Sequence, residues 1–99
     1  MVEHAVVVNV SRYRPAPGRR EELLAAMRQM ATRAVEEEAC FGAQTCSSDR
    51  DGEALVAVSR WRSADALHRF HQTAASVAER EHLSGLLAAP PEHEKLTTL

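Results

Sequence analysis

The segment from Val56 to His71 constrains the fold more than any other part of this chain. It is an alternating apolar stretch that runs into Trp61, meets Ser63 two residues later and continues with the spacing of an amphipathic helix. Ser63 is a typical N-cap, because its hydroxyl oxygen can accept a hydrogen bond from an unpaired N–H of the first helical turn. A strand that passes so directly into a helix places the only tryptophan at the end of a sheet, where small α+β domains often form pockets.

The other segments complete the order strand, helix, strand, strand, helix, strand. His4–Arg12 is rich in valine on both of its faces, which is typical of a covered strand. Tyr13–Gly18 contains two prolines and a glycine and is predicted to be a turn. Apolar spacing in Arg19–Glu38 predicts a helix whose arginines face the solvent. Phe41–Ser48 and Ala54–Trp61 are predicted strands joined by an Asp-Gly hairpin turn.

The second helical region begins after Ser63. Its apolar residues recur on one stripe: Leu67, Phe70, Ala74 and Val77. Thr73 can cap a new helix within this stripe, so one bent helix and two short helices both remain open. The sequence Ala89-Pro90-Pro91 ends the helical region, and Glu94–Leu99 is predicted to form a short closing strand.

This order of elements predicts an α+β fold of the ferredoxin-like split βαβ type, in which a four-stranded antiparallel sheet carries both helices on one face. A chain of 99 residues forms one domain, residues 1–99. The first strand is apolar on both faces, but the helices cover only one. We therefore expect a homodimer that joins the two bare sheet faces. Whether Asn9 points to the helices or to the dimer face depends on the strand register and stays open.

The charge balance argues against nucleic-acid and membrane partners. The chain has 12 Lys and Arg against 14 Asp and Glu, without the basic stripe that neutralises phosphates. No apolar run approaches the roughly 20 residues that span a bilayer. The N-terminal segment lacks the basic and apolar regions of a secretory signal, so we expect a cytoplasmic protein.

Cys40 and Cys46 lie six positions apart on a predicted strand. The even separation places both on the same strand face, about 20 Å apart along an extended chain. This is far beyond the reach of a disulfide. We therefore expect two free thiols in a reducing compartment.

Several segments, in order along the chain, resemble the antibiotic biosynthesis monooxygenase family. A strand ends before Pro17-Gly18, and a long helix opens with Arg19-Arg20-Glu21-Glu22-Leu23. Glu38-Ala39-Cys40-Phe41 resembles the family's Glu-Pro-Gly-Cys segment at the entry to the second strand. Trp61-Arg62-Ser63-Ala64-Asp65-Ala66-Leu67 resembles its Trp-x-Ser-x-x-Ala-Leu signature.

The resemblance implies a dimeric α+β barrel with a pocket between the sheet and the helices of each subunit. Similar proteins include cofactor-free oxygenases of polyketide quinol intermediates, quinol monooxygenases, haem-degrading enzymes and isomerases of small sugar-like signals. The family generally needs no metal ion, and we expect no cofactor here.

Two candidate pocket residues lie on strands. Several relatives place an asparagine where Asn9 stands, and its amide offers both a donor and an acceptor to a carbonyl or a peroxide; the alternative is a bond to neighbouring backbone or water. Trp61 can donate its indole N–H to a substrate oxygen and wall a flat ring. The alternative for Trp61 is a core residue that fixes the second helix on the sheet.

Three further candidates lie on the second helical region. Many relatives carry a histidine where this chain has Phe70, which we expect to line the substrate pocket. His71, turned from it by about 100°, is the candidate base for a phenol or quinol proton, unless it is a surface histidine. Arg80 is a candidate partner for an anionic substrate or a developing negative charge, unless it extends to the solvent.

Other chemistries have less support. Haem-degrading relatives carry their iron-ligating histidine close to Arg80, whereas the nearest histidine here, His82, is two residues away. His68 and His71 are three residues apart on a helix, but no third metal ligand completes the set. We therefore expect a cofactor-independent monooxygenase that acts on an electron-rich aromatic compound with O2. A non-oxidative isomerase, a haem-degrading enzyme and a non-catalytic binding or dimerisation module are the alternatives.

Overall fold

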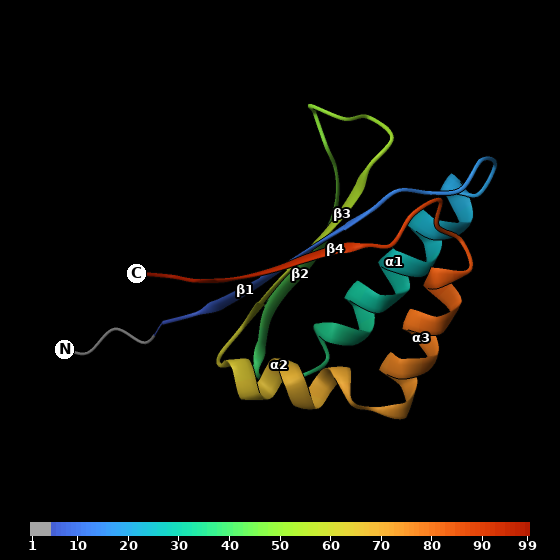
Figure 1. The fold of residues 1–99 in the computed structure, drawn as a ribbon. Helices are drawn as coiled ribbons and strands as arrows, with labels where there is room; N and C mark the ends of the chain where they lie inside the picture. Colours follow the sequence, from blue (N-terminus) through green and yellow to red (C-terminus); the bar gives the residue numbers. More distant parts are fainter. Residues whose placement is uncertain (1–4) are drawn as a thin grey trace.

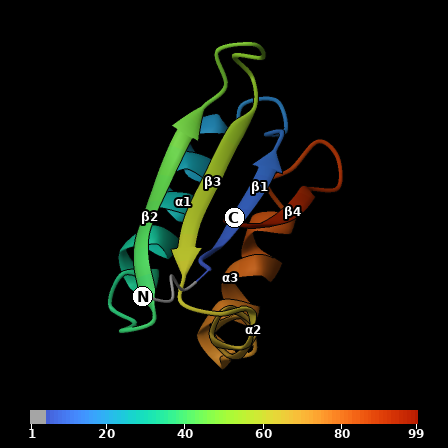
Figure 2. The same ribbon diagram turned by 90° about the vertical axis from the view of Figure 1, so that its left-hand side faces the viewer.

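The computed structural model describes residues 5–99 and shows a four-stranded antiparallel sheet with its helices on one face (Figure 1). The elements, in chain order, are β1 (Val7–Tyr13), α1 (Arg20–Ala34), β2 (Cys40–Ser47), β3 (Leu55–Trp61), α2 (Ala64–His71), α3 (Ala74–Ser84) and β4 (Glu92–Thr97). The strand order across the sheet is β2-β3-β1-β4 (Figure 2). This arrangement confirms the predicted ferredoxin-like α+β fold.

The second helical region consists of two helices, which decides between the two alternatives. The Ser63 hydroxyl accepts a hydrogen bond from the Ala66 N–H at 3.1 Å and caps α2. The Thr73 hydroxyl accepts one from the Ser76 N–H at 3.3 Å and caps α3. Because the chain turns at Thr73, the apolar stripe does not continue along α3, and Val77 is 39% exposed.

Several predicted boundaries were wrong. The closing strand runs over Glu92–Thr97 and not over Glu94–Leu99. Tyr13 belongs to β1 and not to the following turn, because it pairs with Leu55 across the sheet and is buried. Helix α1 ends at Ala34 instead of Glu38. The residues beyond it include three successive glutamates, whose negative charge is unfavourable at the negative end of a helix dipole.

Strand pairing assigns each residue of β1 to one face of the sheet. Val7 and Tyr13 are buried against helical residues. Asn9 and Ser11 lie two and four residues after Val7 and therefore face the helices too. Asn9 lies opposite Ser59 on β3 and Lys95 on β4. The register thus places Asn9 on the helix side of the sheet and leaves the neighbouring valines on the bare face.

The expectation that the two cysteines share a face was wrong. A β-bulge between Cys40 and Gly42 shifts the register of β2 by one residue. Cys40, opposite Trp61, is therefore buried on the helix side, whereas Cys46, opposite Val56, lies on the bare face. Both are free thiols, as expected.

The core on the helix side is divided into two clusters. One lies around Trp61, Leu67 and Phe70 near α2, and the other lies around Leu23 and Leu55 near the start of α1. The strand positions between them carry only small or polar side chains: Asn9, Ser11, Ala43, Thr45, Ala57 and Ser59. These side chains are too short to fill the space under the helices, so a cavity remains there.

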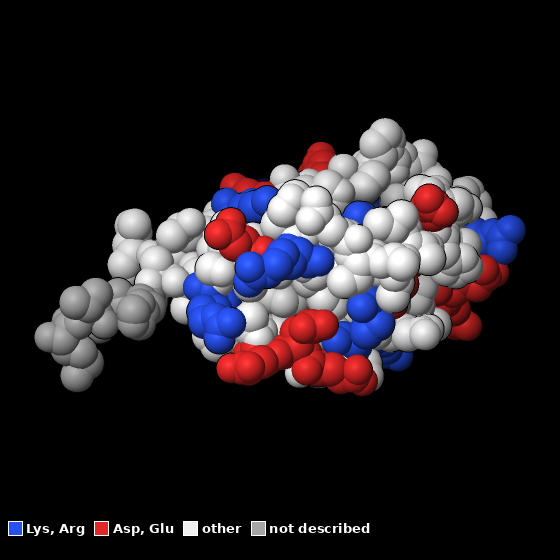
Figure 3. Space-filling view, turned by 90° about the horizontal axis from the view of Figure 1, so that it is seen from below, with Lys and Arg blue, Asp and Glu red and all other residues white. Residues whose placement is uncertain are grey.

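The surface carries both charge signs. In Figure 3, which views the molecule from below the orientation of Figure 1, basic and acidic side chains are interspersed and neither sign dominates. None of the helices in residues 5–99 is long and apolar enough to cross a membrane.

Candidate active site

The candidate site is a cavity of about 80 Å³ between the sheet and the helices. One part of its wall is apolar and comes mainly from α1: Met27, Met30, Ala31, Ala34, Ala43, Ala57 and Phe70. The rest is polar: Asn9, Ser11, Tyr13, Gln44, Thr45, Ser59, His71, Arg80 and His93. No carboxylate lines the cavity within the described part of the chain. Four of the five candidate residues from the sequence meet here, which are Asn9, Phe70, His71 and Arg80.

The fifth candidate, Trp61, lies behind the cavity wall. Its side chain is 1% exposed, and its ring packs against Phe70 with 4.9 Å between the ring centroids. The indole N–H donates a hydrogen bond to the Ser59 hydroxyl at 2.9 Å. Trp61 therefore does not line the cavity itself, but it contacts Phe70 and Ser59, which both do.

His71 lies at the end of α2 and is half-buried in the cavity wall. Burial lowers its pKa to about 4, and the nearby positive charges of Arg80 and Lys95 act in the same direction. The imidazole is therefore neutral at physiological pH and has a nitrogen able to accept a proton. An anion bound beside it would oppose these effects and make His71 a stronger base.

Arg80 reaches the cavity from α3. The apolar stripe of one continuous helix, on which its place was predicted, is interrupted between α2 and α3. Its Nη1 atom is buried and has no hydrogen-bond partner among residues 5–99. The adjacent carboxylate, Glu79, is already paired with Arg33 at 2.6 Å. Arg80 therefore keeps donor capacity and positive charge for something else in the cavity.

Arg33 corrects the prediction that the arginines of α1 face the solvent. Its side chain is only 26% exposed. Besides the ion pair with Glu79, its guanidinium lies 4.6 Å from the centroid of the Phe70 ring. The contact with Phe70 is a cation–π interaction. Together with the ion pair to Glu79, it connects α1 to α2 and α3 and holds Phe70 in the cavity wall.

Sequence reasoning missed a hydrogen-bonded pair at the β4 side of the cavity. The hydroxyl of Ser11, a residue only 4% exposed, lies 2.8 Å from Nδ1 of His93. The Tyr13 ring contacts His93 edge-on at 6.2 Å, and burial raises the pKa of the Tyr13 hydroxyl. Ser11 could have been predicted as a cavity residue, because it lies two residues after Asn9 on the same strand and so shares its face. His93, however, lies one residue before the predicted start of the closing strand.

The site does not resemble a metal or haem centre. His68 and His82 are both exposed, and no group of three or more potential metal ligands occurs in residues 5–99. A cavity of about 80 Å³ has no room for a porphyrin.

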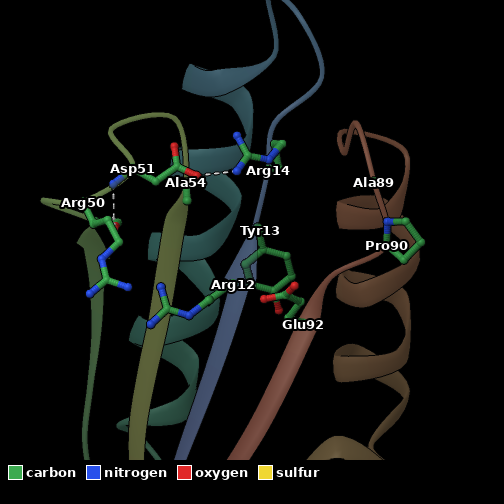
Figure 4. A pocket seen from close by; sticks show the side chains of 10 residues that line it. Arg12, Tyr13, Arg14, Arg50, Asp51, Ala54, Ala89, Pro90 and Glu92 are labelled. Atoms are coloured by element: carbon green, nitrogen blue, oxygen red, sulfur yellow. Dashed lines mark hydrogen bonds and ion pairs between the residues drawn. The ribbon is translucent and has the colours of Figure 1, made fainter.

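A second, larger hollow of about 560 Å³ lies where the β2–β3 hairpin approaches the start of β4 (Figure 4). An ion-pair cluster lies at its wall, where Arg14 pairs with Asp51 and, at 3.2 Å, with Glu53. Arg14 also holds the pKa of the Asp51 carboxyl below its usual value. These ion-pairing groups are largely exposed to solvent, which weakens their electrostatic interactions.

Comparison with known proteins agrees with this architecture. The family model described as antibiotic biosynthesis monooxygenase matches residues 6–81. The structure of Rv0793 from Mycobacterium tuberculosis is similar, with 28% sequence identity, coverage of 95% of both chains and a TM-score of 0.87. No curated protein matches the chain in sequence.

Two more distant solved structures share the fold. A Nitrosomonas europaea protein, named as a candidate antibiotic biosynthesis monooxygenase, has 14% identity, coverage of 100% of this chain and 95% of its own, and a TM-score of 0.88. A Bacteroides thetaiotaomicron protein of unknown function, described as a possible oxidoreductase, has 21% identity, coverage of 98% and 100%, and a TM-score of 0.82. Because the family model spans most of the chain, from the start of β1 into α3, the protein belongs to the antibiotic biosynthesis monooxygenase family.

Proposed function

We propose that this protein is a cofactor-independent monooxygenase that oxidises an electron-rich aromatic compound, such as a quinol or an anthrone-like polyketide intermediate, with O2. The observation that carries the proposal is the interior cavity, in which Asn9, His71 and Arg80 face an apolar wall. Family membership supports the proposal, as do the names of two structural neighbours, a candidate monooxygenase and a possible oxidoreductase.

In the proposed reaction, the neutral imidazole of His71 accepts the proton of a phenolic hydroxyl. The resulting phenolate transfers one electron to O2, and the superoxide and substrate radical then combine to form a carbon–oxygen bond. The peroxide takes up a proton. The hydrogen on the peroxide-bearing carbon then leaves as a proton while the O–O bond breaks, so that water is lost and a new carbonyl remains on the ring. The substrate supplies all the electrons, so the protein contributes orientation and electrostatic stabilisation.

The other cavity residues have separate roles in this proposal. The Asn9 amide holds an oxygen of the substrate or of the peroxide, and Arg80 stabilises the negative charge of the phenolate. Phe70 provides an aromatic wall for the ring. Trp61 was predicted to bind a substrate oxygen, but we assign it a supporting role because its N–H already bonds Ser59.

We also propose that two copies associate through the bare faces of their sheets. This face carries an apolar centre with a charged border. The centre contains Val8, Val10, Val58 and Leu96, and the border contains Arg12, Arg60, Glu92 and Glu94. Leu96 is 44% exposed in the single chain. A second copy would bury the apolar centre and bring basic and acidic border residues together.

The free thiols of Cys40 and Cys46 support the reducing environment of the cytoplasm as the place of action.

Oxygen uptake tests the proposed activity. Purified, metal-free protein is mixed with a panel of hydroquinones and anthrones in an oxygen electrode, and the N9A/H71A double variant is the control. Uptake above autoxidation that the double variant loses is the expected result. Conversion that continues unchanged without oxygen would contradict the proposal and, with an unchanged product mass, would indicate an isomerase.

A further inference from the structure

We propose that the substrate of this cavity is a single-ring aromatic acid, whose carboxylate binds Arg80 while its ring lies against the apolar wall. The inference rests on the proposed function and narrows its substrate class from electron-rich aromatics in general to anionic, one-ring compounds. It rests on three observations: the buried Arg80 Nη1 atom lacks a partner among residues 5–99, no Asp or Glu of these residues lines the cavity, and the cavity is small.

The first argument is the hydrogen-bonding state of Arg80. Its buried Nη1 atom has no acceptor among the described residues. A buried donor without a partner costs about 1–3 kcal/mol, and more when the group is charged. The preceding residue, Glu79, accepts hydrogen bonds from Arg33: Nε donates to both carboxylate oxygens at 3.1 Å, and Nη2 donates to one of them at 2.6 Å. Residues 5–99 therefore provide no acceptor for Arg80 Nη1, and a bound carboxylate supplies both the charge and the geometry.

The second argument is the charge of the surroundings. The charged groups that act on His71 are all basic: Arg80 on α3, Lys95 and His93 on β4, and His68 on α2. No Asp or Glu in the described chain lines the cavity. A neutral ligand would leave this positive potential uncompensated, whereas an anion would neutralise it and gain Coulomb energy in a partly desolvated site.

The third argument is shape. The apolar wall comes from α1 with β2 and β3, and the unpaired arginine lies on the other side with α3 and β4. A ligand that satisfies both sides has a flat apolar body and one acidic end. The cavity of about 80 Å³ is small beside the roughly 300–1,000 Å³ of pockets for drug-sized ligands. This size favours one ring over the three fused rings of an anthrone.

The test compares two hydroquinones that differ in charge. Gentisate carries a carboxylate on the hydroquinone ring, and methyl gentisate is its neutral ester. Their binding to the wild-type protein is measured by anaerobic isothermal titration calorimetry, where no turnover interferes. We expect gentisate to bind at least about tenfold more tightly, which corresponds to about 1.4 kcal/mol.

Two variants and a matched control assign this preference to Arg80. R80Q should abolish the preference for gentisate, and R80K, which keeps the charge, should retain part of it. The control is R69Q, because Arg69 is an exposed arginine on α2; it should leave the preference unchanged. Circular dichroism and the melting temperature show whether each variant folds.

Three results would overturn the inference: equal binding of the two compounds, a preference that survives in R80Q, or no binding of either compound at millimolar concentration. The inference and the proposed function can fail separately. A gentisate preference without oxygen uptake leaves the anion site standing and removes the monooxygenase. Oxygen uptake with neutral quinols, without any gentisate preference, leaves the monooxygenase standing and removes the anion site.

Discussion

Lowering the pH should destabilise the protein through His71. The pKa of this imidazole is about 4 in the folded chain and about 6.5 in an unfolded one. Between these values the unfolded state binds the proton more readily, so the free energy of unfolding decreases as the pH falls. Going from about pH 7 to about pH 5 gives a loss of about 2 kcal/mol from the two pKa values. His71 is only half-buried, and solvent screening reduces this to about 1 kcal/mol.

Urea denaturation at the two pH values measures this loss. The H71Q variant lacks the titrating group, so its stability should change less between pH 7 and pH 5 than that of the wild type, by about 1 kcal/mol. H82Q is the matched control, since His82 is an exposed histidine on α3 that does not contribute to the His71 shift, and it should behave like the wild type. The C2–H proton NMR signals of the histidines provide the pKa of each ring directly.

Two results would refute this reasoning. If H71Q and the wild type lose the same stability, His71 does not titrate differently in the folded and unfolded states. If NMR gives His71 a pKa near its ordinary value of about 6.5, the cavity does not desolvate the ring. In either case His71 would not have the environment that the structure assigns to it.

Three more predictions follow from packing, capping and association. F70A should lose about 3 kcal/mol of unfolding free energy in urea denaturation, because Phe70 is buried against Trp61 and Arg33; a loss below about 1 kcal/mol would contradict its place in the core. T73A removes the cap of α3 and should cost about 1 kcal/mol in the same assay, whereas an unchanged stability would show that the cap is not formed. V58D places a charge in the apolar centre of the bare sheet face and should convert a dimer into a folded monomer in sedimentation experiments; a wild-type monomer or a dimeric V58D would contradict the proposed interface.

The periodic features of the fold could be predicted from the sequence. Alternating valines, helical spacing and an Asp-Gly turn are local patterns, and each specified its element to within a few residues. Ser63 and Thr73 are capping signals that the structure confirms. The bulge after Cys40 could not be predicted, because one extra residue in a strand leaves no mark in its composition. It changed which face of the sheet Cys40 occupies.

The candidate site was only partly predictable, because it depends on contacts between distant segments. Residue chemistry identified Asn9, but only the register of β1 with β3 places it on the helix side. Arg80 was chosen on the assumption of an unbroken helix, and it reaches the cavity from a separate one. His93 depends on the exact start of β4, an edge strand with a weak pattern, so its contact with Ser11 was not foreseen.

The most direct test of the proposed function is the fate of isotopically labelled O2. The protein, freed of metal, is incubated with a substrate that supports oxygen uptake, under oxygen-18 gas, and the product is examined by mass spectrometry. The account predicts one labelled oxygen atom in the product, with the second in water, and loss of labelling in the N9A/H71A variant. A product that forms at the same rate without any label would contradict the assignment as a monooxygenase.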